Sequence, residues 1–511
     1  MSDARVSGVR AALSSYRSLV ILGLCCELVY LGYFERQFSL PAYYHRDTDM
    51  GFITGHSHGG FVMFAAAITI LFVAFALAWR EGGRAPDEYA LRLVLGFGAL
   101  FAVTLTFVYP ITATDLYSYI AQSQVWVHYH HNPIFTPPAQ FAHDPLMALS
   151  DGYQRYGSPY GPLGLMVDAI PSVLFGNRLL ANLLTLKLMF SAMALGSAYV
   201  AYRVMRVVRP SLAVGAALLI AWNPLVLLEV SVNGHNDIAM LLLTLVALLA
   251  VTRNRLLLAP VLLALASMVK YASALLWPLL VLYGLRRQRS LEDRLIYAAS
   301  AVAWSFAVIV VLYFPFWEGR PTLSNLLTQN QRHVNSFSSV LSSVLPGSFS
   351  LGQATIAGWV LFLALYSYLF WSCSVDLPHL LQGCFLALFG FLALAATNVE
   401  AWYLLWPAIV AATVPYLQER AAGVLVSYGV ELSAVVFGYI WVWVSFNPND
   451  LAPLNATTYA MAFLPAVAAL IGLASVRPPG QAAVANTTSP RIAAVPATKK
   501  PRFRDRTKEP G

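Results

Sequence analysis

Charged residues are scarce in this chain. Asp, Glu, Lys and Arg together make up 11% of its 511 residues, whereas soluble globular domains contain roughly 25%. Hydrophobic residues make up 58%, and apolar runs of about 18 residues or more, each long enough to cross a bilayer core of roughly 30 Å, recur along nearly the whole sequence. The composition therefore excludes an ordinary soluble domain and predicts an all-α polytopic membrane protein.

Three further features that the sequence lacks or has little of narrow the function. The chain has four cysteines, all in or beside apolar segments, where packing is their expected use and a disulfide framework is not. The sequence has no Gly-rich nucleotide-binding loop, which disfavours a cytosolic nucleotide-sugar donor. It also shows no repeat of fixed period and no inverted halves with matching interrupted helices, which many secondary transporters have.

Hydropathy divides the chain into about fourteen apolar segments that are predicted to span the membrane. Their ranges are 17–34, 60–79, 91–110, 181–203, 211–230, 238–252, 256–269, 271–285, 295–316, 353–372, 379–397, 401–416, 422–445 and 456–476. With fourteen spans, every basic cluster falls on the same side as the N-terminus, which the positive-inside rule names cytoplasmic. The sequence thus predicts a multi-pass plasma-membrane protein with both termini in the cytoplasm.

The polar, potentially reactive groups converge on the opposite face. They lie in loops 35–59, 111–180 and 317–352 and near residues 233–237, 270–271 and 398–400. This asymmetry predicts chemistry at the external leaflet rather than a pore through the membrane. One of these loops contains three histidines and two aspartates between His45 and His58, but their spacing matches no closed zinc pattern, so no metal site is predicted.

Asp115 is the foremost candidate for catalysis. It lies at the outer end of the third apolar segment and opens the longest polar stretch between hydrophobic segments. A carboxylate at a membrane boundary is costly to dehydrate, so it needs open water or a function. Residues 115–130 can form a helix lying on the membrane surface. Asp115 could act as a general base or cap this helix, and the two roles can coexist.

Lys270 is the foremost candidate for binding an anion. It lies at the turn of a tight apolar hairpin, where an unpaired cation is costly, so it is expected either to pair with a phosphate or carboxylate or to extend to the interface. Tyr271, the next residue in the sequence, is expected to contact the same phosphate headgroup. Arg332 and His333 are second candidates, with a solvated loop as the alternative. Lys187, inside a span, needs a partner or a water-filled cavity.

Three acidic or imidazole groups suit a sugar or a phosphate. His235 and Asp237 lie in a polar pentapeptide at the outer end of a span, where helix capping by Asp237 is the competing explanation. Glu400 is followed by Trp402 and Tyr403, a grouping that suits carbohydrate hydroxyls and ring faces, although an aromatic belt at the membrane interface explains it equally well.

Several short motifs, in order, resemble those of GT-C superfamily glycosyltransferases. They are Thr-Asp-Leu-Tyr-Ser-Tyr (114–119), His-Asn-Pro (131–133), Pro-Tyr-Gly-Pro-Leu (159–163), Trp-Asn-Pro-Leu (222–225), Asn-Gly-His-Asn-Asp (233–237) and Lys-Tyr (270–271). The set is most similar to the actinobacterial polyprenol-phosphomannose-dependent α-1,6-mannosyltransferases. This resemblance implies a GT-C-like bundle whose catalytic module spans 91–476, with outer loop 111–180. Residues 1–90 would form two additional helices, and residues 477–511 a disordered basic cytoplasmic tail.

The resemblance also implies a reaction. A sugar, with mannose favoured, passes from a polyprenyl-phosphate donor to a glycan or glycolipid acceptor with inversion, and Asp115 corresponds to the family's characteristic aspartate. Tyr119, His131 and Tyr160 are then candidates for binding the sugar or the acceptor. No cofactor and no nucleic-acid partner is expected, and membrane lipids surround the protein. A lipid-linked sugar flippase or transporter and a catalytically silent assembly factor are the rival functions.

Overall fold

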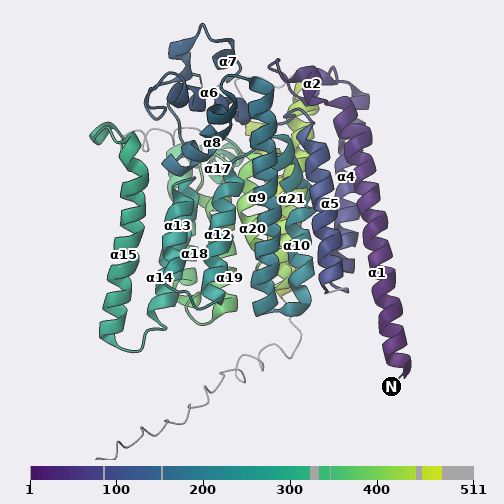
Figure 1. Ribbon diagram of the computed structural model, residues 1–511, viewed down its shortest axis with the longest axis vertical. Helices are drawn as coiled ribbons and strands as arrows, with labels where there is room; N and C mark the ends of the chain where they lie inside the picture. Colours follow the sequence, from purple (N-terminus) through teal and green to yellow (C-terminus); the bar gives the residue numbers. More distant parts are fainter. Residues whose placement is uncertain are drawn as a thin grey trace, which may run out of the picture.

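The computed structural model describes residues 2–84, 87–150, 154–322, 333–345, 347–444 and 452–474. Arg332 and the predicted tail at 477–511 lie outside these ranges. Long helices run roughly parallel, and a group of shorter helices that follows α5 in the chain covers one end of the bundle (Figure 1). We call this the loop end; it carries α6 (Asp115–Val127), α7 (Pro145–Ala148) and α8 (Pro162–Phe175).

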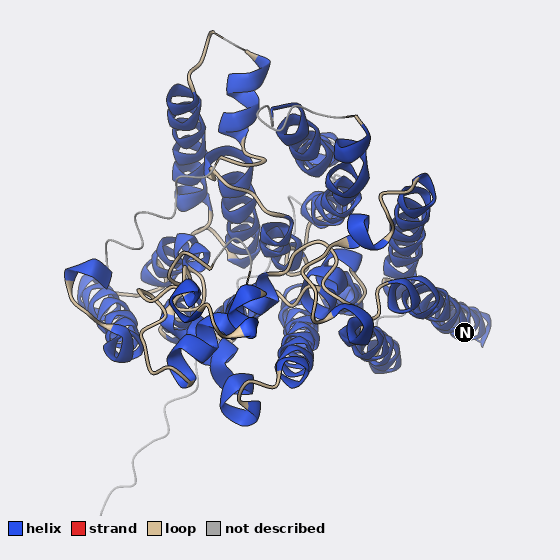
Figure 2. Cartoon of the chain, turned by 90° about the horizontal axis from the view of Figure 1, so that it is seen from above, coloured by secondary structure: helices blue, strands red, loops and turns tan. Residues whose placement is uncertain are grey.

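The described residues are mostly helical, and two isolated bridges are the only strand-like pairings among them. Figure 2 shows most of the long helices nearly end-on, as separate columns. The main helices besides those of the loop end are α1 (Ser2–Val29), α4 (His58–Gly82), α5 (Glu88–Thr106), α9 (Leu179–Val208), α10 (Ala213–Ala221), α12 (Asp237–Thr252), α13 (Leu258–Ser267), α14 (Trp277–Leu285), α15 (Leu291–Tyr313), α17 (Phe337–Val344), α18 (Leu351–Ser372), α19 (Leu377–Gly390), α20 (Leu405–Ala411), α21 (Leu417–Val435) and α23 (Ala452–Ala474).

This architecture confirms the predicted class of polytopic helical membrane protein. Each of the fourteen predicted segments overlaps a helix or a bent pair of helices. Within the described ranges, nine helices are long and apolar enough to cross a membrane, or ten if the bent pair 210–221 and 224–232 counts as one span. The helices 237–252, 258–267, 271–285 and 401–411 are shorter. The count of fourteen full spans therefore stays a prediction.

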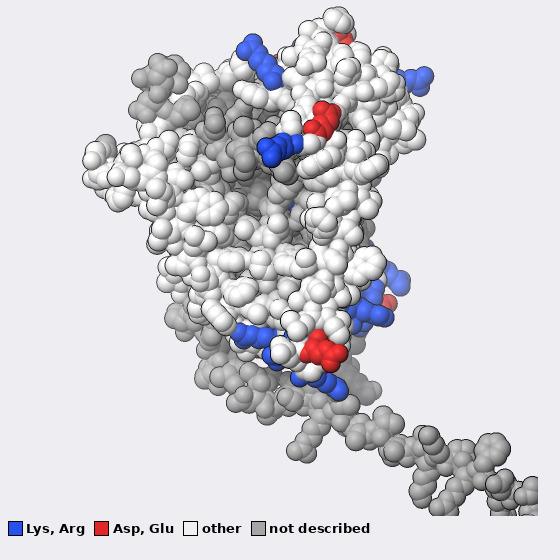
Figure 3. Space-filling view, turned by 90° about the vertical axis from the view of Figure 1, so that its left-hand side faces the viewer, with Lys and Arg blue, Asp and Glu red and all other residues white. Residues whose placement is uncertain are grey.

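Charged side chains gather near the two ends of the molecule. On the face drawn in Figure 3, Lys, Arg, Asp and Glu lie toward the top and the bottom, and uncharged side chains fill the band between them. The connection between α14 and α15, with Arg286, Arg287 and Arg289, lies at the end opposite the loop end (Figure 1). This distribution is the one that a lipid bilayer requires, because charges are costly in its hydrocarbon core.

The helix that follows Asp115 differs from its prediction. Residues 115–130 were expected to lie on the membrane surface with one apolar face, but the side chains from Asp115 to Val125 in α6 are all buried. The helix packs on α8 and α9. The first turn of α6 is therefore enclosed by protein, and Asp115 is enclosed with it.

The histidine-containing loop between α1 and α4 is fixed to the helical segment 436–443 that follows α21. His56 Nδ1 lies 2.8 Å from the carbonyl of Gly438, and Trp443 donates to the His56 carbonyl at 2.7 Å. The ring of His58 packs on the same Trp443 at 4.3 Å. These histidines thus attach the N-terminal segment to the rest of the bundle.

A close backbone contact joins the outer loop to the hairpin that carries Lys270. The amide of Gly161 donates to Val269 O at 3.1 Å, and that of Leu163 donates to Met268 O at 2.8 Å. A Cβ at Gly161 would collide with the Met268 carbonyl, which belongs to the backbone and cannot rotate away. Glycine at this position therefore sets the spacing between the start of α8 and the Lys270 turn.

Gly161→Ala should destabilise the protein by about 1–3 kcal/mol, because overpacking against backbone forces the two segments apart. The thermal unfolding midpoint of the purified protein measures this effect. Gly96→Ala is the matched control, since a Cβ there meets nothing within 4 Å. Equal midpoints for the two variants would show that the contact does not fix the hairpin.

Candidate active site

The candidate site forms at the polar pentapeptide 233–237, which connects η5 (Leu227–Val232) to α12. The π-helical turn η5 ends at Asn233, and Gly234 takes a φ of +76°, a conformation that favours glycine. The Asn233 side chain accepts the Ile111 N–H at 3.1 Å and donates to Thr112 Oγ1 at 2.6 Å. The pentapeptide thereby holds the segment that leads into α6, and it places Asp115 beside His235 and Asp237.

His235 is the centre of a buried group of side chains. Its Nδ1 lies 3.4 Å from the Tyr119 hydroxyl, and its ring stacks on Trp402 at 4.2 Å with an angle of 15°. Its Nε2 lies 3.1 Å from Glu229 Oε2 but is not aligned for a hydrogen bond with any described residue. His235 thus links Tyr119 of α6 to Glu229 of η5.

Asp237 and Lys270 form the main ion pair of the site. Lys270 Nζ lies 2.5 Å from Asp237 Oδ2, and Trp406 donates to Asp237 Oδ1 at 2.6 Å. The ammonium group also lies 5.2 Å from the ring centre of Tyr160 and 5.7 Å from that of Tyr403, which are cation–π distances. The Lys270 side chain is 11% exposed. It therefore turns into the protein and does not extend to the interface.

Asp115 lies within electrostatic reach of this pair. Its carboxylate is buried and makes no hydrogen bond to a described residue, so it does not cap α6, whose N-cap residue is Thr114. Burial raises the pKa of Asp115, the charges of His235 and Lys270 lower it, and Asp237 and Glu229 raise it further. The net result is a pKa above the ordinary aspartate value.

A second buried carboxylate lies nearby in α8. Asn236 donates to Asp168 Oδ2 at 2.9 Å, while Asp168 Oδ1 has no hydrogen-bond partner among the described residues. Burial raises the pKa of Asp168 to about 7, and Lys270 opposes that rise. Asp168 is thus part of the same electrostatic network as Asp115 and Lys270.

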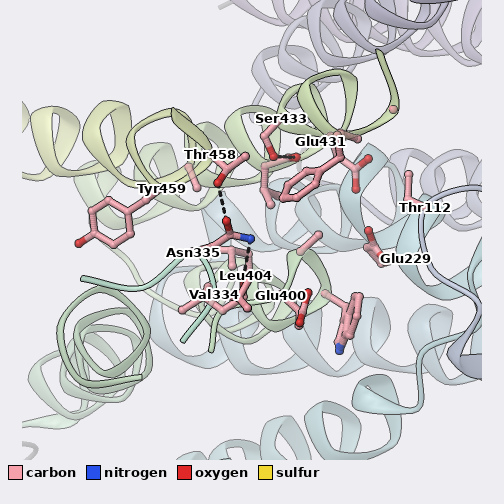
Figure 4. A pocket seen from close by; sticks show the side chains of 18 of the residues that line it. Thr112, Glu229, Val334, Asn335, Glu400, Leu404, Glu431, Ser433, Thr458 and Tyr459 are labelled. Carbon is pink, nitrogen blue, oxygen red and sulfur yellow. Dashed lines mark hydrogen bonds between the residues drawn. The ribbon is translucent and has the colours of Figure 1, made fainter. Parts of the chain in front are cut away.

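A cavity of about 260 Å³ lies next to this network. Glu229, Thr112 and Trp402, which belong to the network or adjoin Asp115 in sequence, form part of its wall. In Figure 4, Glu229 and Glu431 lie on one side of the cavity, and Asn335 and Thr458 lie on the other. The rest of the wall comes from α21 and the turn after it, from α23, from the segments around Val334 and Glu400, and from Asp49, Met50 and Ile111.

Six of the predicted site residues lie together. Asp115, Tyr119, Tyr160, His235, Asp237 and Lys270 form one network of contacts and charges. The alternative that Asp237 caps its helix is wrong, because its two oxygens bond to Lys270 and Trp406. Glu400 lines the cavity, whereas Lys270 is not one of the residues of its wall.

The remaining predicted residues have other contacts. The Tyr271 hydroxyl is bonded to that of Tyr313 at 2.8 Å, so it points to α15 and not along Lys270. His131 is exposed and packs near Phe141 in the outer loop, at 5.6 Å between rings. His333 Nδ1 lies 3.2 Å from Ser338 Oγ. Arg332, as stated above, is outside the described residues.

Sequence reasoning missed Glu229, Glu431, Asp168 and Trp406. Glu229 and Glu431 lie inside stretches predicted as spans, where an ionisable residue is by default a sign of function. Among the ionisable residues inside predicted spans, Lys187 was the one named as a candidate. Lys187 is fully buried and donates to the Val108 carbonyl. Across the described ranges, no three His, Cys, Asp or Glu side chains are grouped so that they could hold a metal ion.

Comparison with known proteins agrees with this arrangement. Residues 30–286 match the sequence model of a family described as alpha-(1->6)-mannopyranosyltransferase, N-terminal domain. The chain is also 24% identical over 405 residues to alpha-(1->6)-mannopyranosyltransferase A of Mycobacterium tuberculosis (strain ATCC 25618 / H37Rv), and the alignment covers 73% of each chain.

The matches and the helical membrane fold together define a membrane mannosyltransferase. The chain belongs to the alpha-(1->6)-mannopyranosyltransferase family. The resemblance found in the sequence motifs is thereby confirmed at the level of the family.

Proposed function

We propose that this protein transfers mannose from a polyprenyl-phosphate donor to a glycan or glycolipid acceptor, with inversion, at the external leaflet. The observation that supports this most is the pairing of opposite charges in one enclosed network: the Asp115 carboxylate, free of hydrogen bonds to described residues, lies within electrostatic reach of Lys270. A base and a cation near the leaving group are the two parts that displacement of a phosphate from a sugar requires.

In the proposed reaction the acceptor hydroxyl oxygen bonds to C1 of the mannosyl group while the bond from C1 to the phosphate oxygen breaks. Asp115 takes the proton of the hydroxyl. Polyprenyl phosphate leaves with the bonding electrons, and Lys270 stabilises its added negative charge. Attack from the face opposite the phosphate inverts C1, so a β-linked donor gives an α-linked product.

Asp237 and the aromatic rings would position the cation for this role. Trp406 fixes one oxygen of Asp237, and the other oxygen holds Lys270. Tyr160 and Tyr403 supply ring faces at cation–π distance from the same ammonium group. Lys270 is thereby held in one place before a donor arrives, which lowers the entropy lost on binding.

The rival transport function receives less support. It predicts ionisable groups near the middle of the bilayer and interrupted helices in paired positions. Lys187 is satisfied by a backbone carbonyl, and a single bent helix pair, with a bend of 41°, is found in the described part of the chain. Glu431 does lie within a span, 417–443, but Asp115, Asp237 and Lys270 all lie at helix ends.

Asp115→Asn should lower kcat by about 10²–10⁴-fold, because the amide cannot accept the proton. Donor binding should stay close to that of the unaltered protein. Transfer of labelled mannose from polyprenyl-phosphate mannose to membrane lipid extract measures turnover. Asp144→Asn is the control, since Asp144 caps α7 in the same outer loop. Near-normal turnover by Asp115→Asn would remove Asp115 as the base.

The pH dependence should follow the raised pKa of Asp115. The base works only when deprotonated, so activity is lost as the pH falls through this pKa and is present above it. We expect the acidic limb of kcat/KM to lie above pH ~3.9, the ordinary aspartate value. Lys270→Ala removes a charge that lowers the pKa, so it should move this limb to higher pH. If the acidic limb of kcat/KM lies at the same pH in the unaltered protein and in Lys270→Ala, the predicted effect of Lys270 on the pKa of Asp115 is wrong.

Lys270→Ala should raise the KM for the donor by about 10- to 100-fold, because a charge-assisted contact to phosphate is lost. The KM for the acceptor should change much less. Arg178→Ala, which removes an exposed cation near the outer loop, controls for the general effect of charge. Equal increases in the two KM values would count against a phosphate at Lys270.

A further inference from the structure

The cavity next to the site is lined by several carboxyl groups and by no described cation. Its wall includes Asp49, Glu229, Glu400 and Glu431, and none of its lining residues is Lys or Arg. The residues that contact Lys270, namely Asp237, Tyr160 and Tyr403, are also absent from this wall. A phosphate diester would find no cationic partner among these lining residues, whereas an uncharged polyol would find carboxyl oxygens that accept hydrogen bonds.

Glu431 has an unmet need for hydrogen-bond donors. It lies in α21 with 2% of its surface exposed, and its Oε1 atom is buried without a hydrogen-bond partner in the described structure. A carboxyl oxygen can accept hydrogen bonds whether or not the group is ionised. Figure 4 places the carboxyl group of Glu431 in the cavity near that of Glu229. Leaving a buried polar atom without a partner is costly, and a ligand with hydroxyl groups would supply one.

The opposite wall is rigid and polar. Asn335 takes a φ of +48°, accepts the Thr458 hydroxyl at 2.6 Å and donates to Val399 O at 3.3 Å. Val334 pairs with the segment at Asn398, which fixes this wall to the strand-like stretch before Glu400. Trp402 adds an aromatic side chain that is itself held against His235. The cavity therefore exists before any ligand binds.

The size of the cavity limits what it can take. Pockets for drug-sized ligands measure roughly 300–1,000 Å³, and this cavity measures about 260 Å³. One hexose ring is therefore a better match than an oligosaccharide chain. A metal ion is a poorer match, because the carboxylates are not grouped in threes within the described residues.

We propose that this cavity binds the terminal hexose of the acceptor, an inference that rests on the proposed function. Glu431 and Glu229 accept hydrogen bonds from its hydroxyl groups, and Trp402 packs against its ring. Thr112 lies in the wall three residues before Asp115. One hydroxyl group of the bound hexose therefore points out of the cavity toward Asp115, the proposed base. The donor phosphate stays on the Lys270 side. The two substrates are thus held by different groups, the phosphate by an ammonium group and the hexose by carboxyl groups.

The test compares acceptor and donor kinetics of Glu431→Gln with an alkyl α-mannoside as the acceptor probe. The KM for this probe should rise about 10- to 100-fold, because the amide places an NH₂ donor where a carboxyl oxygen accepts a hydrogen bond. The KM for polyprenyl-phosphate mannose should stay within about twofold. Glu419→Gln is the matched control: Glu419 is a buried carboxylate at the other end of α21, bonded to Gln382.

A second variant covers the case in which Glu431→Gln fails to fold. Ala434→Phe adds a ring to the cavity wall from a position that is only half-buried, so this variant should fold. The ring should weaken binding of the alkyl mannoside by filling the cavity. A raised donor KM in either variant, or an unchanged acceptor KM in both, would overturn the inference.

Binding of the alkyl mannoside to the purified protein without donor separates this inference from the proposed function. Binding that is lost in Glu431→Gln supports the cavity as a hexose site even if the unaltered protein transfers no mannose from the polyprenyl-phosphate donor, in which case only the proposed function fails. Transfer by the unaltered protein together with unchanged probe binding in Glu431→Gln rejects the cavity and leaves the proposed function standing.

Discussion

The ion pair between Asp237 and Lys270 is the constraint on which the site depends. It joins the start of α12 to the turn after α13, and Trp406 brings in α20 through the second carboxylate oxygen. Removing one member of a buried pair leaves the other charge uncompensated, which costs about 3–5 kcal/mol. Three separate helices are thereby locked at one point, and Tyr160 extends this junction to the outer loop.

Two compartments with different electrostatics follow from this junction. The positive charge of Lys270 is surrounded by aromatic rings and one carboxylate, whereas the neighbouring cavity is lined by carboxylates. Trp402 lines the cavity and stacks on His235, which belongs to the network around Lys270. A low-dielectric surrounding strengthens each local field, so even a short separation is enough to favour an anion on one side and a neutral polyol on the other.

Much of this arrangement could be predicted from the sequence because its parts lie where apolar segments end. Asp115, His235 and Lys270 follow helices that end at one side of the membrane, so their convergence follows from topology. Side-chain direction does not: Tyr271 is adjacent to Lys270 in sequence yet bonds to Tyr313. Glu229 and Glu431 were missed because a hydropathy window averages one carboxylate into an apolar run. The burial of α6 depends on packing against α8 and α9, which no local pattern encodes.

The resting pair of Asp237 and Lys270 does not conflict with the proposed binding of phosphate. An ammonium group has three N–H donors, and the pair with Asp237 occupies one of them. Because Trp406 holds Asp237 from the other side, the carboxylate keeps its place when a second anion approaches. The two remaining donors can serve the phosphate without a break in the pair. Asp237 then orients the cation and moderates its charge, so that the lipid phosphate produced in the reaction can still dissociate.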